Sequence, residues 1–526
     1  MRVREVVELQ MRSARAYANP FADVALDVRF TGPSGISVVV PGFYDGDGTW
    51  RVRFNPPEAG PWRWRATTAP QDPELNASGR FDVEPGGGGR GFLRTEPRTG
   101  WGFEFESGEP VWVFGDTAYN LFGFAHCGLE VDGFLRRRAE QGFNLLRVRL
   151  SVSPTSDSQE TRPSISDEWH TRSCWPWGGD RDEPEFDRFN LDWFRTVDRV
   201  VGECERLGMG LEMIAEGWGS QFPFNRRQDF TTEWEELWLR YLIARYDAYS
   251  CVWFWTPLNE YEYYPHGRWR YAPLADRWAM RVSRWIKQTA THGHIVSAHH
   301  AHAEPPFADR FAADPDAIDT VMIQCWGTIG ESDGWLAAGI EEQLERILAG
   351  WRGSAVLSEY GYELNPSLPL SDPPDFHRWC DVHHTRRGAW RAAFSGYGIV
   401  HGFENTWGPY AILDKDQDGV AQLLVLRHFL HRVVPFASVR PAPELVVAAQ
   451  WPEGCAPLAL ADAERRLIAV YLPAGGEVRL HLPRQDYHAS WFDPRTAELT
   501  DAGTGPLFSA PTATATRDSD RVLVLS

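Results

Sequence analysis

The sequence lacks any continuous apolar stretch long enough to cross a membrane. No run approaches the roughly eighteen uninterrupted apolar residues that a transmembrane helix needs. The N-terminal stretch MRVREVVELQMRSARAY alternates apolar and charged residues and contains no apolar segment followed by a small-residue cleavage site. It therefore predicts no secretory leader. Together these absences favour a cytoplasmic protein with no membrane partner.

Metal-binding patterns are also scarce. The seven cysteines are odd in number and contain no CxxC pair, which predicts reduced thiols and no zinc site. His299, His300 and His302 form a local cluster, but no second group of ligands stands at a metal-binding spacing. The run DKDQDG (414–419) resembles the start of an EF-hand loop, yet its twelfth position is Val425 rather than glutamate, so a polar turn or a calcium site of another type is expected. The sequence predicts no catalytic metal and no organic cofactor.

Positive charge is in deficit. The chain carries 53 Lys and Arg against 72 Asp and Glu, a net charge of −19, and this field repels nucleic acids and anionic membranes. The sequence is rich in aromatic residues, with 25 Trp, 29 Phe and 16 Tyr. Their flat faces suit the C–H faces of sugar rings, although core packing must account for most of them. A neutral carbohydrate substrate fits this composition, which does not indicate an oligomeric state.

Short strand-like runs occupy both ends of the chain. The N-terminal runs include VALDVRF, GISVVV, TWRVRF and PWRWRATT, separated by turn signals such as DGDG, a pattern typical of a β-sandwich. They end at Pro85 and the glycine run 86–89, which reads as a linker. Runs such as LALAD, LIAVYLP and RVLVLS recur near the C-terminus. We therefore predict an N-terminal β-sandwich over 1–90 and a smaller β-domain over 441–526.

Between these ends, over 91–440, strand-like runs alternate with amphipathic helical stretches. This alternation predicts an α/β fold, a (β/α)8 TIM barrel. A doubly wound open sheet is the alternative, but no GxGxxG follows an early strand. A long loop over 151–190, after the second strand, is expected to cover the pocket. The eight expected strands are 111–116, 143–150, 210–216, 252–260, 294–300, 320–326, 354–360 and 398–405.

Acidic residues end five of these eight strands. In such a barrel the C-terminal strand ends build the active site, and several acids gathered there raise one another's pKa values at a cost in stability, which indicates function. Cleavage of a glycosidic bond needs two carboxyl groups. Glu260 on the fourth strand and Glu359 on the seventh can face each other across the pocket. The other strand-end acids are Asp116, Glu216 and Glu404.

Two motifs carry a resemblance to known enzymes. TPLNEYE, with Asn259 before Glu260, and LSEYG, with Glu359, resemble the large clan of retaining barrel glycosidases. The resemblance implies that Glu260 is the acid/base, Asn259 contacts the substrate 2-hydroxyl, and Glu359 is the nucleophile. RAEQGFNLLRV resembles the clan segment whose arginine, here Arg147, supports the nucleophile.

A narrower resemblance covers most of the chain. GDTAYNLF, GFNLLRV and WFDPRTAEL resemble apiosidase-like hydrolases, and GFYDGDGTWRVRFNPPEAGPWRW resembles the β-sandwich that often precedes such barrels. These resemblances imply a retaining glycoside hydrolase that acts through a covalent glycosyl-enzyme intermediate on a pyranoside or furanoside.

Other residues are expected to bind the sugar. These are Asp116, His299, Gln324, Glu404 and Trp407. Asp116 could instead cap the following helix, and Trp407 could pack in the core. Two rival functions remain: a carbohydrate-binding protein on a degenerate barrel, and a transglycosylase or phosphorylase that uses the same covalent intermediate.

Overall fold

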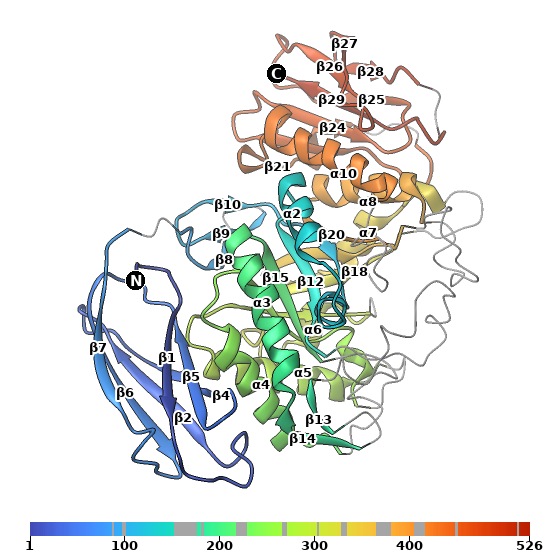
Figure 1. The fold of residues 1–526 in the computed structure, drawn as a ribbon. Coiled ribbons are helices and arrows are strands. Elements are labelled where there is room, and N and C mark those ends of the chain that lie inside the picture. The colour runs from blue at the N-terminus through green and yellow to red at the C-terminus, as the bar shows by residue number, and fades with distance from the viewer. Residues whose placement is uncertain are drawn as a thin grey trace.

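The computed structural model describes residues 1–86, 89–96, 101–151, 176–179, 183–216, 229–265, 271–301, 304–327, 334–363, 380–403, 416–447, 451–512 and 515–526. Antiparallel sheets stand at both ends of the chain, and an α/β barrel lies between them (Figure 1). Within these residues no helix is long and apolar enough to cross a membrane. The six cysteines among these residues carry free thiols, and Cys174 lies outside the described residues.

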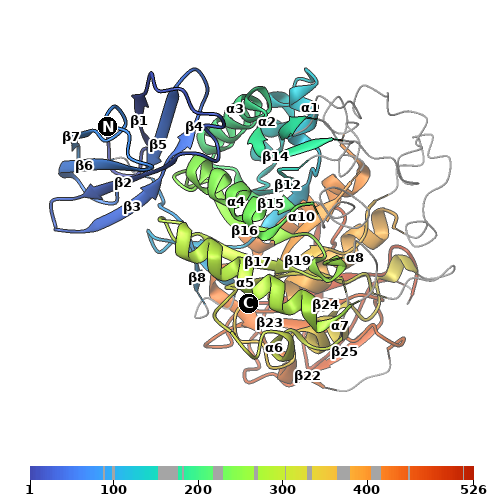
Figure 2. The same cartoon turned by 90° about the horizontal axis from the view of Figure 1, so that it is seen from below.

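The N-terminal region contains two antiparallel sheets, in agreement with the predicted β-sandwich. In β2 the buried positions alternate with exposed ones, which turns Leu26, Val28 and Phe30 into the core. There Phe30 stacks on Phe54 at 4.3 Å between ring centroids. Figure 2 shows these sheets beside α3 and α4 of the barrel. Their strands are β1 (Val7–Arg12), β2 (Ala25–Thr31), β3 (Ser37–Pro41), β4 (Phe43–Tyr44), β5 (Thr49–Phe54), β6 (Gly60–Ala69) and β7 (Ser78–Val83).

Eight parallel strands form a closed barrel, so the predicted fold class is confirmed. The strands follow one another in chain order, and β11 pairs with β20 to close the ring. They are β11 (Phe114–Thr117), β12 (Leu145–Arg149), β15 (Gly210–Glu216), β16 (Val252–Leu258), β17 (Ile295–His299), β18 (Thr320–Gln324), β19 (Ser354–Glu359) and β20 (Gly398–Gly402). A hairpin of β13 (Trp177–Gly179) and β14 (Pro184–Phe189) lies in the stretch expected to be a loop.

Helices cover the outside of the barrel, and α3 shows how the sequence specifies them. The Asn190 side chain accepts hydrogen bonds from the backbone N–H groups of Asp192 and Trp193, which caps the helix start. Gly208 ends the helix in the left-handed conformation, at φ 67°. Between these ends the apolar residues recur every three or four positions and face the core: Trp193, Phe194, Val197, Val200, Val201 and Cys204.

The helices have the following bounds. They are α1 (Leu121–His126), α2 (Asp132–Gln141), α3 (Leu191–Leu207), α4 (Thr232–Tyr246), α5 (Pro273–Thr289), α6 (Phe307–Arg310), α7 (Ile340–Ile347), α8 (Val382–Phe394) and α10 (Asp418–His428). Shorter 3-10 turns are η4 (Tyr261–Tyr263), η5 (Gly334–Leu336), η9 (Phe436–Ser438) and η10 (Pro443–Leu445), and η8 (Phe429–Val433) is a π turn.

A small sheet that the sequence did not predict covers the end of the barrel at which the barrel strands begin. It contains β8 (Leu93–Glu96), β9 (Gly102–Phe105) and β10 (Pro110–Val111). Its apolar side chains share one cluster with residues near the starts of the barrel strands, among them Leu145 and Ile295. Apolar side chains therefore fill the end of the barrel at which its strands start.

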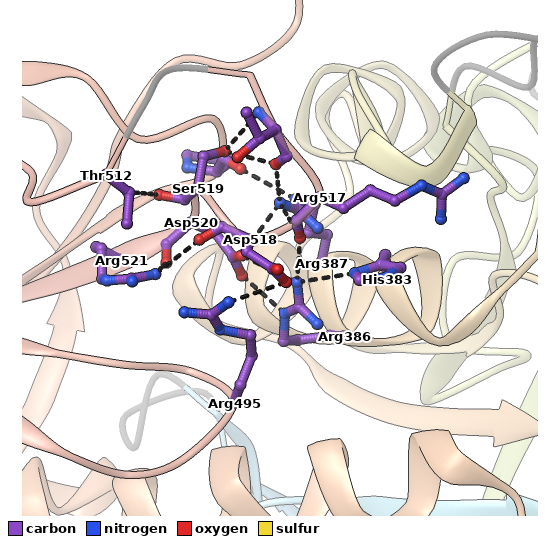
Figure 3. A network of polar contacts seen from close by, with 12 residues as sticks. His383, Arg386, Arg387, Arg495, Thr512, Arg517, Asp518, Ser519, Asp520 and Arg521 are labelled. Atoms are coloured by element: carbon purple, nitrogen blue, oxygen red, sulfur yellow. Dashed lines mark hydrogen bonds and ion pairs between the residues drawn. The ribbon is translucent and has the colours of Figure 1, made fainter.

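The C-terminal region packs on the barrel through α8. The Trp390 ring of α8 stacks on Tyr471, with centroids 5.5 Å apart. Beside this contact, Asp520 is fully buried between two arginines of α8, with Arg386 Nε at 2.9 Å and Arg387 Nη2 at 3.1 Å (Figure 3). These guanidinium groups outweigh the effect of burial and lower the Asp520 pKa to about 2. The C-terminal sheets are therefore joined to the barrel by both apolar and ionic contacts.

Two sheets make up this C-terminal region (Figure 1). The larger has the order β21-β23-β24-β29-β26-β27 and the smaller β22-β25-β28. The strands are β21 (Val439–Pro441), β22 (Val446–Val447), β23 (Leu458–Asp462), β24 (Ile468–Leu472), β25 (Glu477–Leu480), β26 (Ala489–Phe492), β27 (Leu499–Gly503), β28 (Leu507–Ser509) and β29 (Arg521–Leu525).

Candidate active site

A layer of polar side chains lies inside the barrel, above the apolar floor. Thr256 on β16 donates a hydrogen bond of 2.8 Å from Oγ1 to Glu212 Oε1, and its hydroxyl lies 2.6 Å from Ser297 Oγ on β17. The Glu212 carboxylate on β15 forms an ion pair with Arg147 on β12, with Oε2 and Nε 3.1 Å apart. All four side chains are fully buried, so this layer supports the groups above it without contact with solvent.

Arg147 joins this layer to the predicted catalytic residues. Its Nη1 lies 3.2 Å from Glu359 Oε2, and its Nη2 donates to Asn259 Oδ1. The structure thus brings together three residues that the sequence analysis had placed on three separate strands. A guanidinium presents its donors in one rigid plane, so the orientation of Arg147 determines how Asn259 and Glu359 are held.

Glu359 is the last residue of β19, and its carboxylate is held through both oxygens. Pairing between β18 and β19 shifts register at Ile323 and Gln324. Gln324 Nε2 donates to Glu359 Oε1 at 2.7 Å, while the Tyr119 hydroxyl donates to Oε2 at 3.2 Å. With Arg147 also on Oε2, the carboxylate has a fixed position and a nearby positive charge.

Glu260 lies two residues after the end of β16 and occupies the left-handed region, at φ 54° and ψ 59°. This conformation is uncommon and costs free energy in residues other than glycine. Its backbone N–H donates to His299 Nδ1 at 3.2 Å, so the neutral His299 ring carries its proton on Nε2, 3.6 Å from Glu359 Oε2. Burial and the charge of Arg147 lower the His299 pKa well below its ordinary value, in agreement with a neutral ring.

The two glutamates interact, and Glu260 strongly favours its protonated form. Burial raises the pKa of Glu260 well above its ordinary value, and the charges of Glu359 and Glu262 raise it further. The Gln324 amide donates to Glu359 and lies close enough to the Glu260 carboxyl to lower its pKa, against the larger effect of burial. One side chain is therefore close to both carboxyl groups. A buried acid that keeps its proton, next to a carboxylate beside a guanidinium, is the arrangement that acid-assisted attack on a substrate requires.

Not every predicted residue belongs to this cluster. Asp116 forms a fully buried ion pair with Arg138 of α2, with Oδ2 and Nε 2.7 Å apart. This contact favours a structural role for Asp116 over the expected contact with a sugar. Glu404 and Trp407 lie outside the described residues. His300 stacks on Phe307, with ring centroids 5.1 Å apart.

Several residues that contact the predicted site were missed in the sequence analysis. Tyr119 lies in the GDTAYNLF motif but follows the strand end that was considered. Tyr362, three positions after Glu359, hydrogen-bonds that carboxylate, and burial raises the Tyr362 pKa. Glu212 lies inside the apolar run GLEMIAE, and its charge within a buried strand was the available signal.

The structure gives a different role to part of the run that resembles a calcium loop. Asp416 Oδ1 forms an ion pair with Arg138 Nη1 at 2.6 Å and lies 3.2 Å from Arg137 Nε. Asp414 lies outside the description. Within the described residues, no group of three or more His, Cys, Asp or Glu side chains is arranged to hold a metal ion.

Comparisons with known proteins agree with this architecture. Three family models match: a domain of unknown function (DUF5060) at residues 2–69, an apiosidase-like catalytic domain at 100–426, and a putative collagen-binding domain of a collagenase at 441–526. No functionally curated protein matches the chain.

Solved structures share the fold. A putative glycoside hydrolase from Bacteroides vulgatus is 18% identical with a TM-score of 0.71, over 100% of this chain and 99% of that one. A family 5 glycoside hydrolase from Bacteroides vulgatus is 15% identical with a TM-score of 0.59, over 83% of this chain and 92% of that one. The apiosidase-like match covers more than half of the sequence, as the sequence motifs had indicated. The chain therefore belongs to the family of apiosidase-like catalytic domains and is a glycoside hydrolase.

Proposed function

We propose that the enzyme cleaves a glycosidic bond with retention of configuration, with Glu359 as nucleophile and Glu260 as acid/base. The observation that supports this most strongly is that one amide, Gln324, donates to the Glu359 carboxylate and also lies close to the Glu260 carboxyl, whose pKa it lowers. A retaining mechanism needs two carboxyl groups roughly 5–5.5 Å apart, and two carboxyl groups close to the same amide favour such a short separation.

In the first step, a Glu359 oxygen attacks the anomeric carbon while Glu260 gives its proton to the departing glycosidic oxygen. The bond to the leaving group breaks, and a covalent glycosyl ester of Glu359 forms. Glu260 is now a carboxylate and accepts a proton from water, which attacks the anomeric carbon and releases the sugar and Glu359. Because the ester is neutral, the charge that helped to keep the proton on Glu260 is gone in this intermediate. Glu260 then becomes a better base for the second step.

Asn259 orients the substrate in this proposal. Its Oδ1 accepts from Arg147, so the Nδ2 group is the end that can donate to a sugar hydroxyl. The acidic groups Glu212, Glu260 and Glu359 gather around a single arginine, Arg147. A further negative charge on the substrate would be repelled there, so a neutral pyranoside or furanoside is the expected substrate.

The test is hydrolysis of a panel of neutral aryl pyranosides and furanosides by the wild type and by Glu260→Ala and Glu359→Ala. Glu464→Ala, at an exposed position, is the control and should retain wild-type activity. Azide should rescue Glu260→Ala with a glycosyl azide of retained configuration, and should rescue Glu359→Ala with the inverted product.

Other outcomes would point elsewhere. Activity that survives both substitutions contradicts the assignment of the site. Transfer of the sugar to an added alcohol in place of water favours a transglycosylase. Binding of a sugar without cleavage favours the carbohydrate-binding alternative.

A further inference from the structure

We propose that Glu212 is a positioning residue that also balances the charge of Arg147 during the reaction. This inference rests on the proposed role of Glu359 as nucleophile. Glu212 lies in the middle of β15, below the strand ends, and acts through Arg147 rather than on the substrate.

The Glu212 carboxylate is held on both sides. One oxygen pairs with Arg147 Nε at 3.1 Å, and the other accepts the 2.8 Å hydrogen bond from Thr256. Thr256 is in turn 2.6 Å from Ser297. Four consecutive strands of the barrel, β12, β15, β16 and β17, therefore contribute to a fixed carboxylate in a fully buried position. Burial of a charge is costly unless it is paired, so this acid needs a specific partner, and Arg147 is that partner.

Each nitrogen of the Arg147 side chain has its own partner. Nε faces Glu212, Nη1 faces Glu359 and Nη2 faces Asn259. Because the guanidinium is planar and rigid, fixing its Nε edge fixes the directions of the other two nitrogens. Glu212 thereby orients the donors that hold the nucleophile and the substrate-orienting amide.

Charge changes around Arg147 during the reaction give Glu212 a second role. In the resting enzyme the arginine is close to two carboxylates. When Glu359 becomes a glycosyl ester, it no longer supplies a negative charge, and Arg147 would be a buried cation without a counter-charge. Glu212 remains paired with it, which stabilises the intermediate and the transition state that leads to it. In the resting state Glu212 also shares the positive charge, so Arg147 holds the Glu359 carboxylate less tightly and leaves it more nucleophilic.

The surrounding charged and titratable groups set the expected pH response. The groups around Glu359 are Arg147, Tyr119, Tyr362, His299 and Glu260. Glu260 is also close to Glu262. The Glu262 carboxylate forms an ion pair with Arg310 at 2.5 Å. Glu359 likewise raises the pKa of Glu212, in the same direction as burial, whereas Arg147 lowers it. Loss of the Glu212 charge makes this whole group more positive. Both carboxyl groups should then lose their protons at lower pH.

The experiment compares kcat/KM against pH for the wild type and Glu212→Gln on the same cleaved aryl glycoside. The glutamine keeps the size of the side chain and an oxygen for Thr256, but removes the charge. We expect kcat/KM to fall about tenfold or more, with both limbs of the pH profile displaced to lower pH by about one unit. KM should change less than kcat, because the lost charge acts mainly on the nucleophile and Asn259 keeps its own bond to Arg147.

The matched control is Glu341→Gln. Glu341 is also buried, pairs with the buried Arg391 at 2.5 Å, and has a pKa that burial raises, but it lies on α7 outside the barrel. Its removal should leave the pH profile unchanged. Thr256→Val removes one hydrogen bond to Glu212 and keeps the charge, so the limbs should stay in place in that variant as well.

Unmoved limbs in a folded Glu212→Gln protein would overturn the inference, as would equal displacement in Thr256→Val. If Glu212→Gln does not fold, Glu212→Asp replaces it: the charge is kept, so wild-type limbs with a lower kcat are expected, and displaced limbs count against the inference. Glu359→Gln is measured in parallel. Wild-type turnover in that variant means that the proposed function is wrong, whereas an inactive Glu359→Gln beside an unshifted Glu212→Gln rejects only the role of Glu212.

Discussion

Replacement of Glu363 by glutamine is expected to remove a pH-dependent loss of stability. The Glu363 carboxyl is 3% exposed and lies between the end of β19 and the start of α10, where its Oε1 accepts a 2.8 Å hydrogen bond from the Gly419 N–H. Its pKa is raised from 4.5 to about 7: burial is the largest cause, the charges of Asp418 and Asp381 act in the same direction, and the hydrogen bonds from Thr385 and Gly419 oppose them. The folded protein thus holds this proton more tightly than the unfolded chain does.

The sign and size of the effect follow from this difference. A raised folded-state pKa contributes stability that is fully present below pH 4.5 and is lost as pH rises through about 7. The difference between 4.5 and 7 corresponds to about 3 kcal/mol. The carboxylate at the N-terminus of α10 gains only about 0.3–1 kcal/mol from the helix dipole, so burial dominates. Glutamine stays neutral and keeps an oxygen for Gly419.

The assay is chemical denaturation of the wild type and Glu363→Gln from pH 4.5 to 8. The two proteins should be nearly equal at pH 4.5, and the variant should be more stable by up to about 3 kcal/mol at pH 8. Exposed Glu464→Gln serves as the control and should follow the wild type. A difference that is constant with pH, or a wild type that gains on the variant as pH rises, would refute the reasoning.

Two further substitutions test the packing around the barrel. Asp520→Asn leaves two buried arginines of α8 without their carboxylate and should lower the free energy of unfolding by about 3–5 kcal/mol. The control, Asp486→Asn at an exposed position, should lower it by at most about 1 kcal/mol. Chemical denaturation measures both losses, and equal losses would contradict the prediction. Gly419→Ala places a methyl group against the Glu363 carboxyl and should destabilise the protein. Gly202→Ala in α3 places its methyl group in open space and should stabilise the protein by up to about 1 kcal/mol. Melting temperatures of the two variants that move in the same direction would contradict the close packing of Gly419 against Glu363.

The order of the barrel strands could be predicted because each strand is a short apolar run bounded by turns. Seven of the eight expected runs contain a whole strand of the closed barrel, and 210–216 matches β15 at both ends. The first run, 111–116, overlaps β11 from Phe114 but ends one residue before that strand does. The sheet of β8–β10 was missed, since its strands are short and lie close to the predicted linker. Its role is visible only from its packing with residues such as Leu145, a contact that no local pattern encodes.

The direction of individual side chains was harder to predict. In a half-buried strand, alternation of apolar and polar residues tells which side faces inward. Barrel strands are buried on both faces and lose that alternation, as the fully buried pattern of β15 and β16 illustrates. A strand-end acid can therefore lie on either side. Asp116 pairs with Arg138 of α2, whereas Glu359 contacts Arg147 inside the barrel, next to a register shift between β18 and β19.

Glu212 shows what kind of signal remains in such strands. A carboxylate inside an apolar run must be paired, because an isolated buried charge is too costly to keep. Arg147 stands on the adjacent strand at the paired position, since β12 and β15 align Arg147 with Glu212. Once the strand order is known, side-by-side charges of opposite sign on neighbouring buried strands predict an ion pair. An arginine that faces two carboxylates predicts a positive charge shared between them. The effect of Glu212→Gln on both limbs of the pH profile tests whether such a pair belongs to the catalytic machinery or only to the core.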